Sequence, residues 1–378
     1  MEIFQFNNVN VILILTITFY ACFLIQLIYY LGIYSRIIFL KKTKIKIKSL
    51  PVSIIICTKN KAASLEKNLP SILTQNHPKY EVIVVNDCSI DNSEEILSKF
   101  KQKYSHLRTT SIIKDEKFSH GKKLALTIGI KAAKNEWLLL TDADCFAESK
   151  NWLSIMQKNF TEKTTFVLGY GGYMYKKGIL NNLIRFDTLF IAMQYFSFAL
   201  AGFPYMGVGR NLAYRKSVFF QNRGFASYTH LDSGDDDLFV NKIATKNNTK
   251  IELDAQSHTR SEPKTTLNEW IYQKRRHLTT GKYYNFKTKF LLGGEVVSRI
   301  LFYILFILLT INNPFIEYIL GAFILRLLIQ LTIFKIAMNR LNEKYLLLSS
   351  LMFDIILPFF NLHLIILNFT TSKRTKWK

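Results

Sequence analysis

The residues of this sequence whose types and spacing could do chemistry are aspartates. They are Asp87, the pair Asp142 and Asp144, and the consecutive Asp235, Asp236 and Asp237. Two carboxylates in D-x-D order at the end of a strand point to the same side of the chain, and their oxygens suit hard cations such as Mg²⁺ or Mn²⁺. Such a cation can bridge a diphosphate and take up charge as it leaves. The D-x-D pattern alone is a weak signal, because any turn can carry two aspartates.

Short apolar segments before Asp87 and before the pair Asp142 and Asp144 are predicted to be strands of one sheet. Residues 52–57, 81–85 and 137–140 are short and nearly all apolar, which is typical of a parallel sheet covered on both faces. The other elements predicted here are a strand over 109–113 and helices over 65–73, from 93 onward and over 121–133. In open α/β sheets, ligands bind beyond the carboxyl ends of the strands, where Asn60 and the first three aspartates fall. We therefore expect these side chains to converge on one crevice.

No phosphate-binding glycine motif follows the first predicted strand. Neither GxGxxG nor GxxxxGK[ST] is present there, so the sequence indicates neither a dinucleotide-binding fold nor a P-loop.

The overall composition favours a protein attached to a membrane. The chain has 378 residues, 49% of them apolar, and 50 basic against 27 acidic side chains give a net charge of +23. Such a charge needs a polyanionic neighbour, which could be nucleic acid, a phosphate-rich substrate or the anionic face of a bilayer. The apolar residues are concentrated at 9–31 and 296–369. We therefore expect a lipid-bilayer partner and no nucleic-acid partner.

The N-terminal apolar segment, residues 9–31, is predicted to be a permanent membrane anchor. About 23 residues give a helix of roughly 35 Å, enough to cross the hydrocarbon. A cleaved signal peptide is not favoured, because the preceding residues carry Glu2 and no Lys or Arg. The lysines that follow are Lys41, Lys42, Lys44, Lys46 and Lys48. By the positive-inside rule they place the central domain in the cytoplasm, at a bacterial-type inner (plasma) membrane.

Three further apolar segments follow the central region, at about 296–311, 314–334 and 345–369. The first two are predicted to form a hairpin that turns at Asn312, Asn313 and Pro314. The third is interrupted by Asp354, Pro358 and His363, so we expect a re-entrant or interfacial helical pair that returns the basic tail to the cytoplasm. A fourth crossing is the alternative.

Residues 179–203 could also pass for a membrane span, but they contain Arg185, Asp187 and Gln194. We expect an amphipathic helix that lies on the bilayer surface. The predicted division of the chain is therefore an N-terminal anchor over 1–40, a cytoplasmic domain over 50–290, and C-terminal membrane helices over 291–371.

The ordered motifs at 52–60, 82–91, 121–123 and 138–144 resemble the nucleotide-sugar-binding half of family 2 glycosyltransferases. The segments at 209–216, 233–238 and 273–277 look like the acceptor side of that family, in the right order. The resemblance covers roughly residues 50–285. It implies an α/β domain of the GT-A type with a mostly parallel central sheet, here flanked by N-terminal and C-terminal transmembrane helices.

The resemblance also implies roles for individual residues. Asp87 would read the nucleobase, Asp142 and Asp144 would hold the ribose and a diphosphate-bound Mg²⁺ or Mn²⁺, and Asp236 would be the catalytic base. The residues expected on the donor side are Thr58, Asn60, Asp87, Lys122, Asp142, Asp144, Gln273, Arg275 and Arg276. Those expected on the acceptor side are Gly209, Arg210, Asn211, Asp235 and Asp237.

Two of these assignments have alternatives. Asp235 or Asp237 could be the base in place of Asp236, and the whole acidic run could simply be the N-cap and first turn of a helix. Arg275 and Arg276 could pair with pyrophosphate oxygens or with anionic lipid.

The function implied is inverting transfer of a sugar from a nucleotide-diphospho-sugar to a lipid-linked or cell-envelope glycan acceptor. Processive synthases of the family show Gln-x-x-Arg-Trp, whereas position 277 is His. This difference and the small number of C-terminal spans favour single-sugar transfer. A processive polysaccharide synthase and a catalytically inactive membrane scaffold of the same fold are the alternatives.

Overall fold

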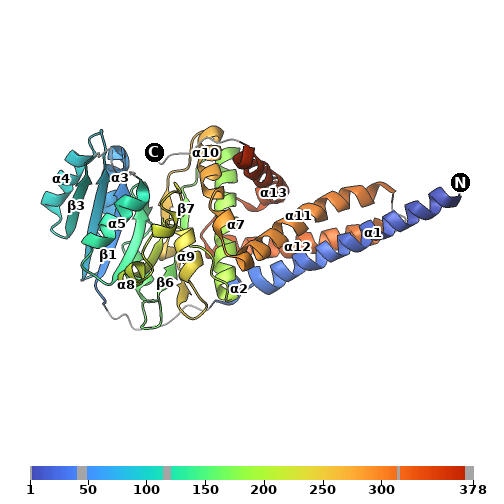
Figure 1. The fold of residues 1–378 in the computed structure, drawn as a ribbon, viewed down its shortest axis with the longest axis horizontal. Helices are drawn as coiled ribbons and strands as arrows, with labels where there is room; N and C mark the ends of the chain where they lie inside the picture. The colour runs from blue at the N-terminus through green and yellow to red at the C-terminus, as the bar shows by residue number, and fades with distance from the viewer. Residues whose placement is uncertain (1, 41–48, 114–120, 313–315, 371–378) are drawn as a thin grey trace.

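The computed structural model describes residues 2–40, 49–113, 121–312 and 316–370 (Figure 1). Some residues used for the topology predictions lie outside this described part: the lysines at 41–48, two residues of the predicted hairpin turn (313 and 314) and the basic tail at 371–378.

The N-terminal half of the α/β domain alternates strands and helices as predicted. Its elements are β1 (Val52–Thr58), α3 (Ala62–Leu73), β2 (Tyr80–Asp87), α4 (Ser93–Lys103), β3 (Leu107–Ile112), α5 (Lys122–Ala132) and β4 (Trp137–Asp142). β1 pairs in parallel with both β2 and β4, and β2 pairs in parallel with β3. The carboxyl ends of β1, β2 and β4 therefore meet at one edge.

Successive side chains of these strands enter two different cores. Ile54 belongs to a cluster with Leu65 of α3, whereas Ile55 belongs to one with Leu126 of α5. The approach of α5 depends on a glycine, because a Cβ at Gly129 would lie 2.7 Å from Ile55 Cγ2. Both faces of the sheet are covered, which explains why its strands are apolar throughout.

The rest of the domain extends this sheet and adds a small second one. The seven-stranded sheet has the order β3-β2-β1-β4-β8-β6-β9, with β8 antiparallel to β4 and β6. The three-stranded sheet has the order β5-β10-β7. The added strands are β5 (Cys145–Ala147), β6 (Phe166–Leu168), β7 (Gly171–Tyr173), β8 (Leu212–Arg215), β9 (Thr249–Ile251) and β10 (Thr259–Ser261). The added helices are α6 (Trp152–Gln157), α8 (Lys216–Gln221), α9 (Asp237–Ile243) and α10 (Leu267–Leu278), with short 3-10 helices η2 (Ala226–Tyr228), η3 (Ala255–Ser257) and η4 (Gly281–Tyr283).

Long apolar helices project from the α/β domain (Figure 1). α1 (Glu2–Leu27), α11 (Phe286–Asn312) and α12 (Ile316–Arg340) lie together, and α1 continues through a π-helix, η1 (Ile28–Tyr34), into α2 (Arg36–Phe39). Five helical segments in the described part of the chain are long and apolar enough to cross a membrane. The predicted N-terminal and C-terminal membrane helices are therefore present.

The expected surface helix at 179–203 is present as α7 (Ile179–Leu200), but its predicted environment is wrong. Its apolar window is 72% buried inside the protein, where it contacts η1, α2, α12 and α13. Its polar side chains find partners there: Arg185 pairs with Glu343, and Asp187 pairs with Lys274. These charges mark a helix that is buried between the α/β domain and the bundle.

The last apolar segment forms one helix, α13 (Leu347–Thr370), and not the predicted helical pair. Pro358 lies inside this helix without ending it. α13 packs against α7, α10, α11 and α12 close to the α/β domain. Its return to the side of the membrane where it began stays a prediction.

Candidate active site

Lys122 joins two of the aspartate groups. It is the first residue of α5, and its Nζ lies 3.0 Å from Asp142 Oδ1 and 3.1 Å from Asp235 Oδ2. Burial lowers the pKa of Lys122, but the charges of the two aspartates outweigh burial, so the pKa is raised well above its usual value. A permanent cation therefore connects the end of β4 to the segment that begins α9.

Asp235 and Asp237 are both occupied by structural partners. Burial opposes the charged form of Asp235, but Lys122 outweighs this effect and the pKa of Asp235 is lowered. Asp237 is buried, and its Oδ2 accepts hydrogen bonds from the hydroxyls of Thr280 (2.5 Å) and Tyr284 (2.8 Å). Burial raises the pKa of Asp237 although both hydroxyls favour its charged form. These contacts fasten α9 to the chain after α10.

Asp236 has a different environment. Its Oδ2 accepts the backbone N–H of Gly209 at 2.6 Å, and its Oδ1 accepts that of Asp237 at 2.8 Å. Burial and the neighbouring charges of Asp235 and Asp237 raise the pKa of Asp236 to about 7. The same side chain is the N-cap of α9, as the alternative interpretation expects. The cap orients the carboxyl group and is compatible with a role as base.

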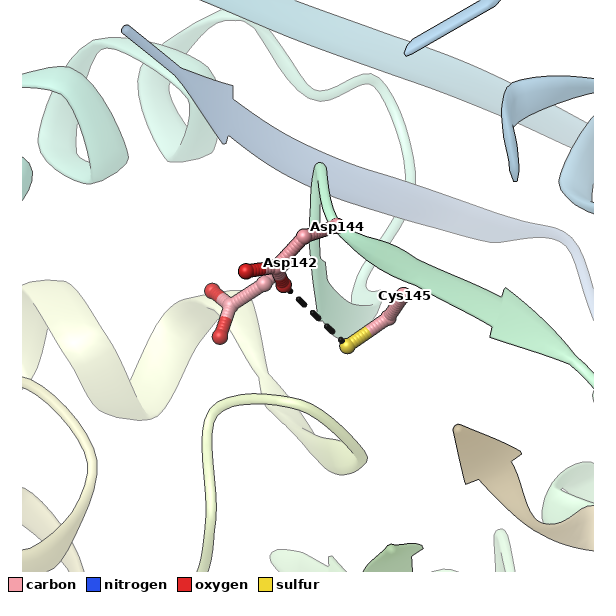
Figure 2. A group of neighbouring side chains, drawn as sticks. All are labelled: Asp142, Asp144 and Cys145. Carbon is pink, nitrogen blue, oxygen red and sulfur yellow. Dashed lines mark hydrogen bonds between the residues drawn. The ribbon is translucent and has the colours of Figure 1, made fainter. Parts of the chain in front are cut away.

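The D-x-D pair and Cys145 form a group with the spacing of metal ligands (Figure 2). One ligand atom from each of Asp142, Asp144 and Cys145 lies within 4.8 Å of the others. Burial and the charge of Asp142 raise the pKa of Asp144, so the pair would gain from a cation between the carboxylates. Burial also raises the pKa of Cys145 well above its usual value, and its thiol donates to Asp144 Oδ1 at 3.7 Å. Two carboxylates beside a protonated thiol fit Mg²⁺ or Mn²⁺ better than a thiophilic metal.

The predicted nucleobase side lies at the ends of β1 and β2. Asp87 is fully buried at the end of β2, and Lys59 Nζ lies 3.9 Å from its Oδ2. Asn60 has a positive φ of 51° and joins the two loops: its side chain accepts the N–H of Ile90 at 2.8 Å, and its own N–H donates to Ser89 at 2.9 Å. Asn60 is therefore a loop-shaping residue.

Several buried polar atoms around this edge have no hydrogen-bond partner among the described residues. They are Thr58 Oγ1, Thr141 Oγ1, Gln273 Oε1 and Arg276 Nε. Thr58 and Thr141 lie at the carboxyl ends of β1 and β4, and Gln273 and Arg276 belong to α10. An unpaired buried polar atom costs about 1–3 kcal/mol, so these atoms point to a polar ligand.

The expected acceptor-side residues divide into two kinds. A Cβ at Gly209 would lie 3.3 Å from Lys122 Nζ and 3.4 Å from Asp236 Oδ2, so glycine leaves room at the aspartate cluster. Arg210 packs 4.4 Å from the centre of the Tyr173 ring. Asn211 is fully buried, with its amide bonded to Trp152 and to two backbone carbonyls, and thus has a structural position.

The side chains of the basic segment of α10 contact different parts of the protein. Gln273 Nε2 donates to Tyr173 Oη at 3.1 Å, which places it next to Arg210. Arg275 Nε donates to Asn368 of α13 at 2.8 Å, and the Asn368 amide donates back to the Arg275 carbonyl at 3.0 Å. Arg275 therefore fastens α10 to α13, a contact that the donor-binding prediction did not anticipate.

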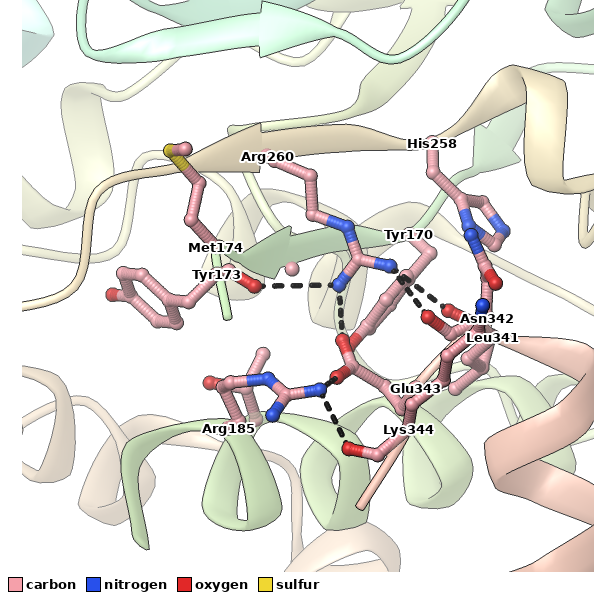
Figure 3. Close-up of polar contacts among 12 residues, drawn as sticks. Tyr170, Tyr173, Met174, Arg185, His258, Arg260, Leu341, Asn342, Glu343 and Lys344 are labelled. Atoms are coloured by element: carbon pink, nitrogen blue, oxygen red, sulfur yellow. Dashed lines mark hydrogen bonds and ion pairs between the residues drawn. The ribbon is translucent and has the colours of Figure 1, made fainter. Parts of the chain in front are cut away.

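The functional neighbours that sequence reasoning missed are Tyr173, Thr280 and Tyr284, because no motif marks them. A second missed group surrounds Glu343, in the loop between α12 and α13 (Figure 3). Glu343 accepts from Arg260 of β10 and from Arg185 of α7, and Arg260 Nε lies 3.1 Å from Glu148. Because β10 pairs with β5, which follows the D-x-D pair, this network connects the membrane helices to the candidate metal site.

Residues 53–220 match the family model described as Glycosyl transferase family 2. A poly-beta-1,6-N-acetyl-D-glucosamine synthase of Staphylococcus epidermidis is 29% identical over 111 residues, which are 29% of this chain and 25% of that protein. A poly(ribitol-phosphate) beta-glucosyltransferase of Bacillus spizizenii is 31% identical over 120 residues, 30% of this chain and 18% of that protein. The chain thus spans a quarter or less of the length of these relatives.

A solved structure with a similar fold is the mannosyltransferase PcManGT from Pyrobaculum calidifontis in complex with GDP-Man and Mn²⁺. It matches with a TM-score of 0.58 at 17% identity, over 96% of this chain and 99% of that one. The fold and the candidate site define a GT-A-like α/β domain joined to membrane helices. The chain carries a glycosyl transferase family 2 domain.

Proposed function

We propose that this protein is a membrane-anchored, inverting glycosyltransferase. It moves a sugar from a nucleotide-diphospho-sugar donor to a lipid-linked or cell-envelope glycan acceptor. The observation that carries the proposal is the position of Lys122, whose ammonium contacts both Asp142 of the D-x-D pair and Asp235 next to the candidate base. This contact supports a single site that contains the donor-side and acceptor-side groups.

In this proposal Asp236 is the catalytic base. Its carboxylate takes the proton of the acceptor hydroxyl as that oxygen attacks the anomeric carbon. The bond between this carbon and the nucleoside diphosphate breaks, and the nucleoside diphosphate leaves from the opposite face. The N–H groups of Gly209 and Asp237 hold the carboxylate in position. A pKa of about 7 makes Asp236 a stronger base than an exposed aspartate while leaving a large ionised fraction near neutral pH.

The donor is held by groups at the carboxyl ends of β1, β2 and β4. Asp87 reads the nucleobase, Thr58 and Asn60 shape the pocket, and Gln273 and Arg276 contact the diphosphate; Asp235 and Asp237 position Asp236. Asp142 and Asp144 would hold a Mg²⁺ or Mn²⁺ ion, which would supply positive charge for the diphosphate. The Mn²⁺ ion in the complex of the similar mannosyltransferase supports a divalent cation.

The location of the acceptor follows from the attachment of the site to the membrane helices. The anchor over 1–40 and the helices over 291–371 hold the catalytic domain, residues 50–290, at the cytoplasmic face of a bacterial-type inner membrane. A reporter fused after residue 378 should therefore be cytoplasmic, and an external reporter would contradict this topology.

A polymerising enzyme is the second candidate. It is favoured by the name of the staphylococcal relative, a polysaccharide synthase. Single transfer is preferred because His277 stands where processive members have Trp. Analysis of product length with a purified acceptor distinguishes the two.

The proposal is tested with the full-length protein in nanodiscs containing Mn²⁺ and a panel of sugar nucleotides. One donor should raise the thermal midpoint and release nucleoside diphosphate when an acceptor is added. Asp236→Asn should keep the donor-induced stabilisation and lose transfer, whereas Asp232→Asn, an exposed aspartate nearby, should keep both. If no donor stabilises the protein, the scaffold alternative is favoured.

A further inference from the structure

A second cavity lies away from the aspartate cluster, where α11 leaves the α/β domain. Its volume is about 240 Å³. Its walls come from the end of α7 and the following loop, the segment after α9, and the first turns of α11. Pockets for drug-sized ligands are typically about 300–1,000 Å³, so this cavity suits a part of a larger molecule.

The cavity lies at the N-terminal end of α11, a helix long and apolar enough to cross a membrane. α11 has 27 residues and is therefore about 40 Å long, longer than the roughly 30 Å hydrocarbon core. Its first turn carries two strongly exposed aromatic rings, Phe286 (82% exposed) and Phe290 (71%), which stack on each other. Exposed aromatic rings beside lysines at the end of an apolar helix are typical of the membrane interface.

Two lysines border the cavity. Lys287 Nζ lies 4.0 Å from the centre of the Phe203 ring, and the stem of Lys246 passes so close to Gly202 that a Cβ there would lie 3.2 Å from Lys246 Cδ. Among the described residues, neither lysine has a carboxylate within ion-pair distance. The lining also includes the apolar side chains of Phe198 and Leu292. The cavity thus combines apolar and polar walls with two lysines that form no ion pair in the described part of the chain.

We infer that this cavity binds the headgroup region of an anionic membrane phospholipid. The phosphate would lie between Lys246 and Lys287, and the glycerol and first methylenes would contact Phe203 and Leu292. A zwitterionic lipid also carries a phosphate, but its own cation would face the two lysines. The cavity therefore selects for net negative charge.

The cavity is also in contact with the candidate site. Asn241 of α9 donates to the carbonyl of Tyr205 and to the hydroxyl of Thr288, both in the cavity wall, and accepts the N–H of Asn285. Asp236 is the N-cap of α9. A lipid in the cavity would therefore stabilise the element that positions the proposed base.

Lipid binding is measured directly, without an activity assay. The full-length protein, purified in detergent and delipidated, is titrated with phosphatidylglycerol or phosphatidylcholine of the same acyl chains and analysed by native mass spectrometry. Phosphatidylglycerol should bind at least about tenfold more tightly than phosphatidylcholine. Equal affinity for the two lipids would overturn the proposal.

Two matched pairs of variants test where the lipid binds. The pair Lys246→Ala and Lys287→Ala should weaken phosphatidylglycerol binding about tenfold. The control pair Lys282→Ala and Lys289→Ala removes the same charge from neighbouring exposed positions outside the cavity, and it should change the affinity less than twofold. An equal loss in both pairs would mean diffuse surface attraction and would contradict a site.

A variant that keeps both lysines tests the contribution of the cavity wall. Phe203→Ala removes the half-exposed ring under Lys287 and should weaken binding at least about threefold. An unchanged affinity in this variant would mean that the lipid is held outside the cavity, and the proposal would then be wrong.

Discussion

Two regions of this molecule bury several charged side chains, and they do so in opposite ways. In the helix bundle, Asp354 of α13 accepts from Arg299 (2.8 Å), Arg326 (3.2 Å) and the hydroxyl of Tyr303 (2.6 Å). Glu295 pairs with the same Arg299 at 3.2 Å. Two acidic and two basic side chains thus balance within one network that joins α11, α12 and α13.

At the edge of the sheet the charges do not balance. Among the described residues, the ion pairs of this cluster join Lys122 to Asp142 and Asp235. Asp144 lies in the field of Lys61, Arg210 and Lys264 without an ion pair to any of them. The neighbouring Lys123 is directed elsewhere, since its Nζ donates to the carbonyls of Leu231 and Ser233. Burial, together with the neighbouring carboxylates, raises the pKa values of Asp144 and Asp236.

The difference separates a structural network from a working site. A balanced network gains nothing from a further charged ligand, whereas an acidic excess is relieved by a cation or by a proton. For the sheet-edge cluster we propose both uses, with a cation at Asp144 and a proton at Asp236.

The largest expected effect tests the site directly. Asp236→Asn keeps the shape of the side chain and removes its ability to take a proton, so transfer should fall by about 10²–10⁴-fold. Donor binding should be nearly unchanged. Initial rates and donor-induced shifts of the thermal midpoint measure the two properties. A loss of donor binding of the same size would mean that another aspartate is the base.

The same variant should be more stable than the parent at alkaline pH. The pKa of Asp236 is about 7 in the folded protein and near 3.8 when unfolded, so the folded state binds more protons between these values and stability falls as pH rises through them. Above pH 7 the ionised group costs on the order of 1–3 kcal/mol, which Asn avoids. The thermal midpoints of the two proteins should converge near pH 4, and a constant difference at all pH values would contradict this cause.

The bundle should respond to the loss of charge with a loss of stability. Asp354→Leu leaves Arg299 and Arg326 buried without their shared partner, which should cost about 3–5 kcal/mol. Glu317→Gln, on the exposed side of α12, is the matched control and should change stability by less than about 0.5 kcal/mol. Thermal unfolding in detergent measures both. A mild effect of Asp354→Leu would mean that the network is not a structural one.

Lys122→Met removes a positive charge from the acidic cluster and so increases its difference from the charge-balanced helix bundle. The charge of Lys122 lowers the pKa of Asp236, so its removal should raise that pKa further. In the parent protein kcat/KM should rise with pH up to about 7 and then level off; in the variant the rise should shift to higher pH, with a rate loss of about 10–100-fold at neutral pH. Lys131→Met, an exposed position on the same helix, should leave the profile unchanged. An unshifted rise in Lys122→Met would separate Lys122 from the base.

The parts of the structure that follow from local pattern are predictable from the sequence. The parallel strands are apolar throughout because both faces are covered, and the aspartates follow the strand ends directly. For this reason the convergence of Asp87 and Asp142 on the two sides of β1 could be deduced, since Cys57 pairs with both Val85 and Asp142 in the sheet.

The parts that depend on distant partners could not be deduced in this way. Arg185 and Asp187 suggest a helix facing water, yet both are buried, because Glu343 and Lys274 come from other segments. Pro358 suggests a break, yet α13 continues through it. The choice of Asp236 among three neighbours likewise depends on Lys122, Thr280 and Tyr284, which no sequence spacing links to it.

The smallest expected effect concerns Cys145 in the candidate metal group. Its thiol lies among the possible ligands, but it is buried with a raised pKa and donates to Asp144. Cys145→Ser retains a donor at this position, so the Mn²⁺ dependence of donor binding should change less than about twofold, because a protonated thiol is not a metal ligand. Asp144→Asn, which removes a carboxylate at the same site, should weaken that dependence by about tenfold or more. If instead the serine variant lost the Mn²⁺ dependence of donor binding, the thiol would be a metal ligand beside the two carboxylates.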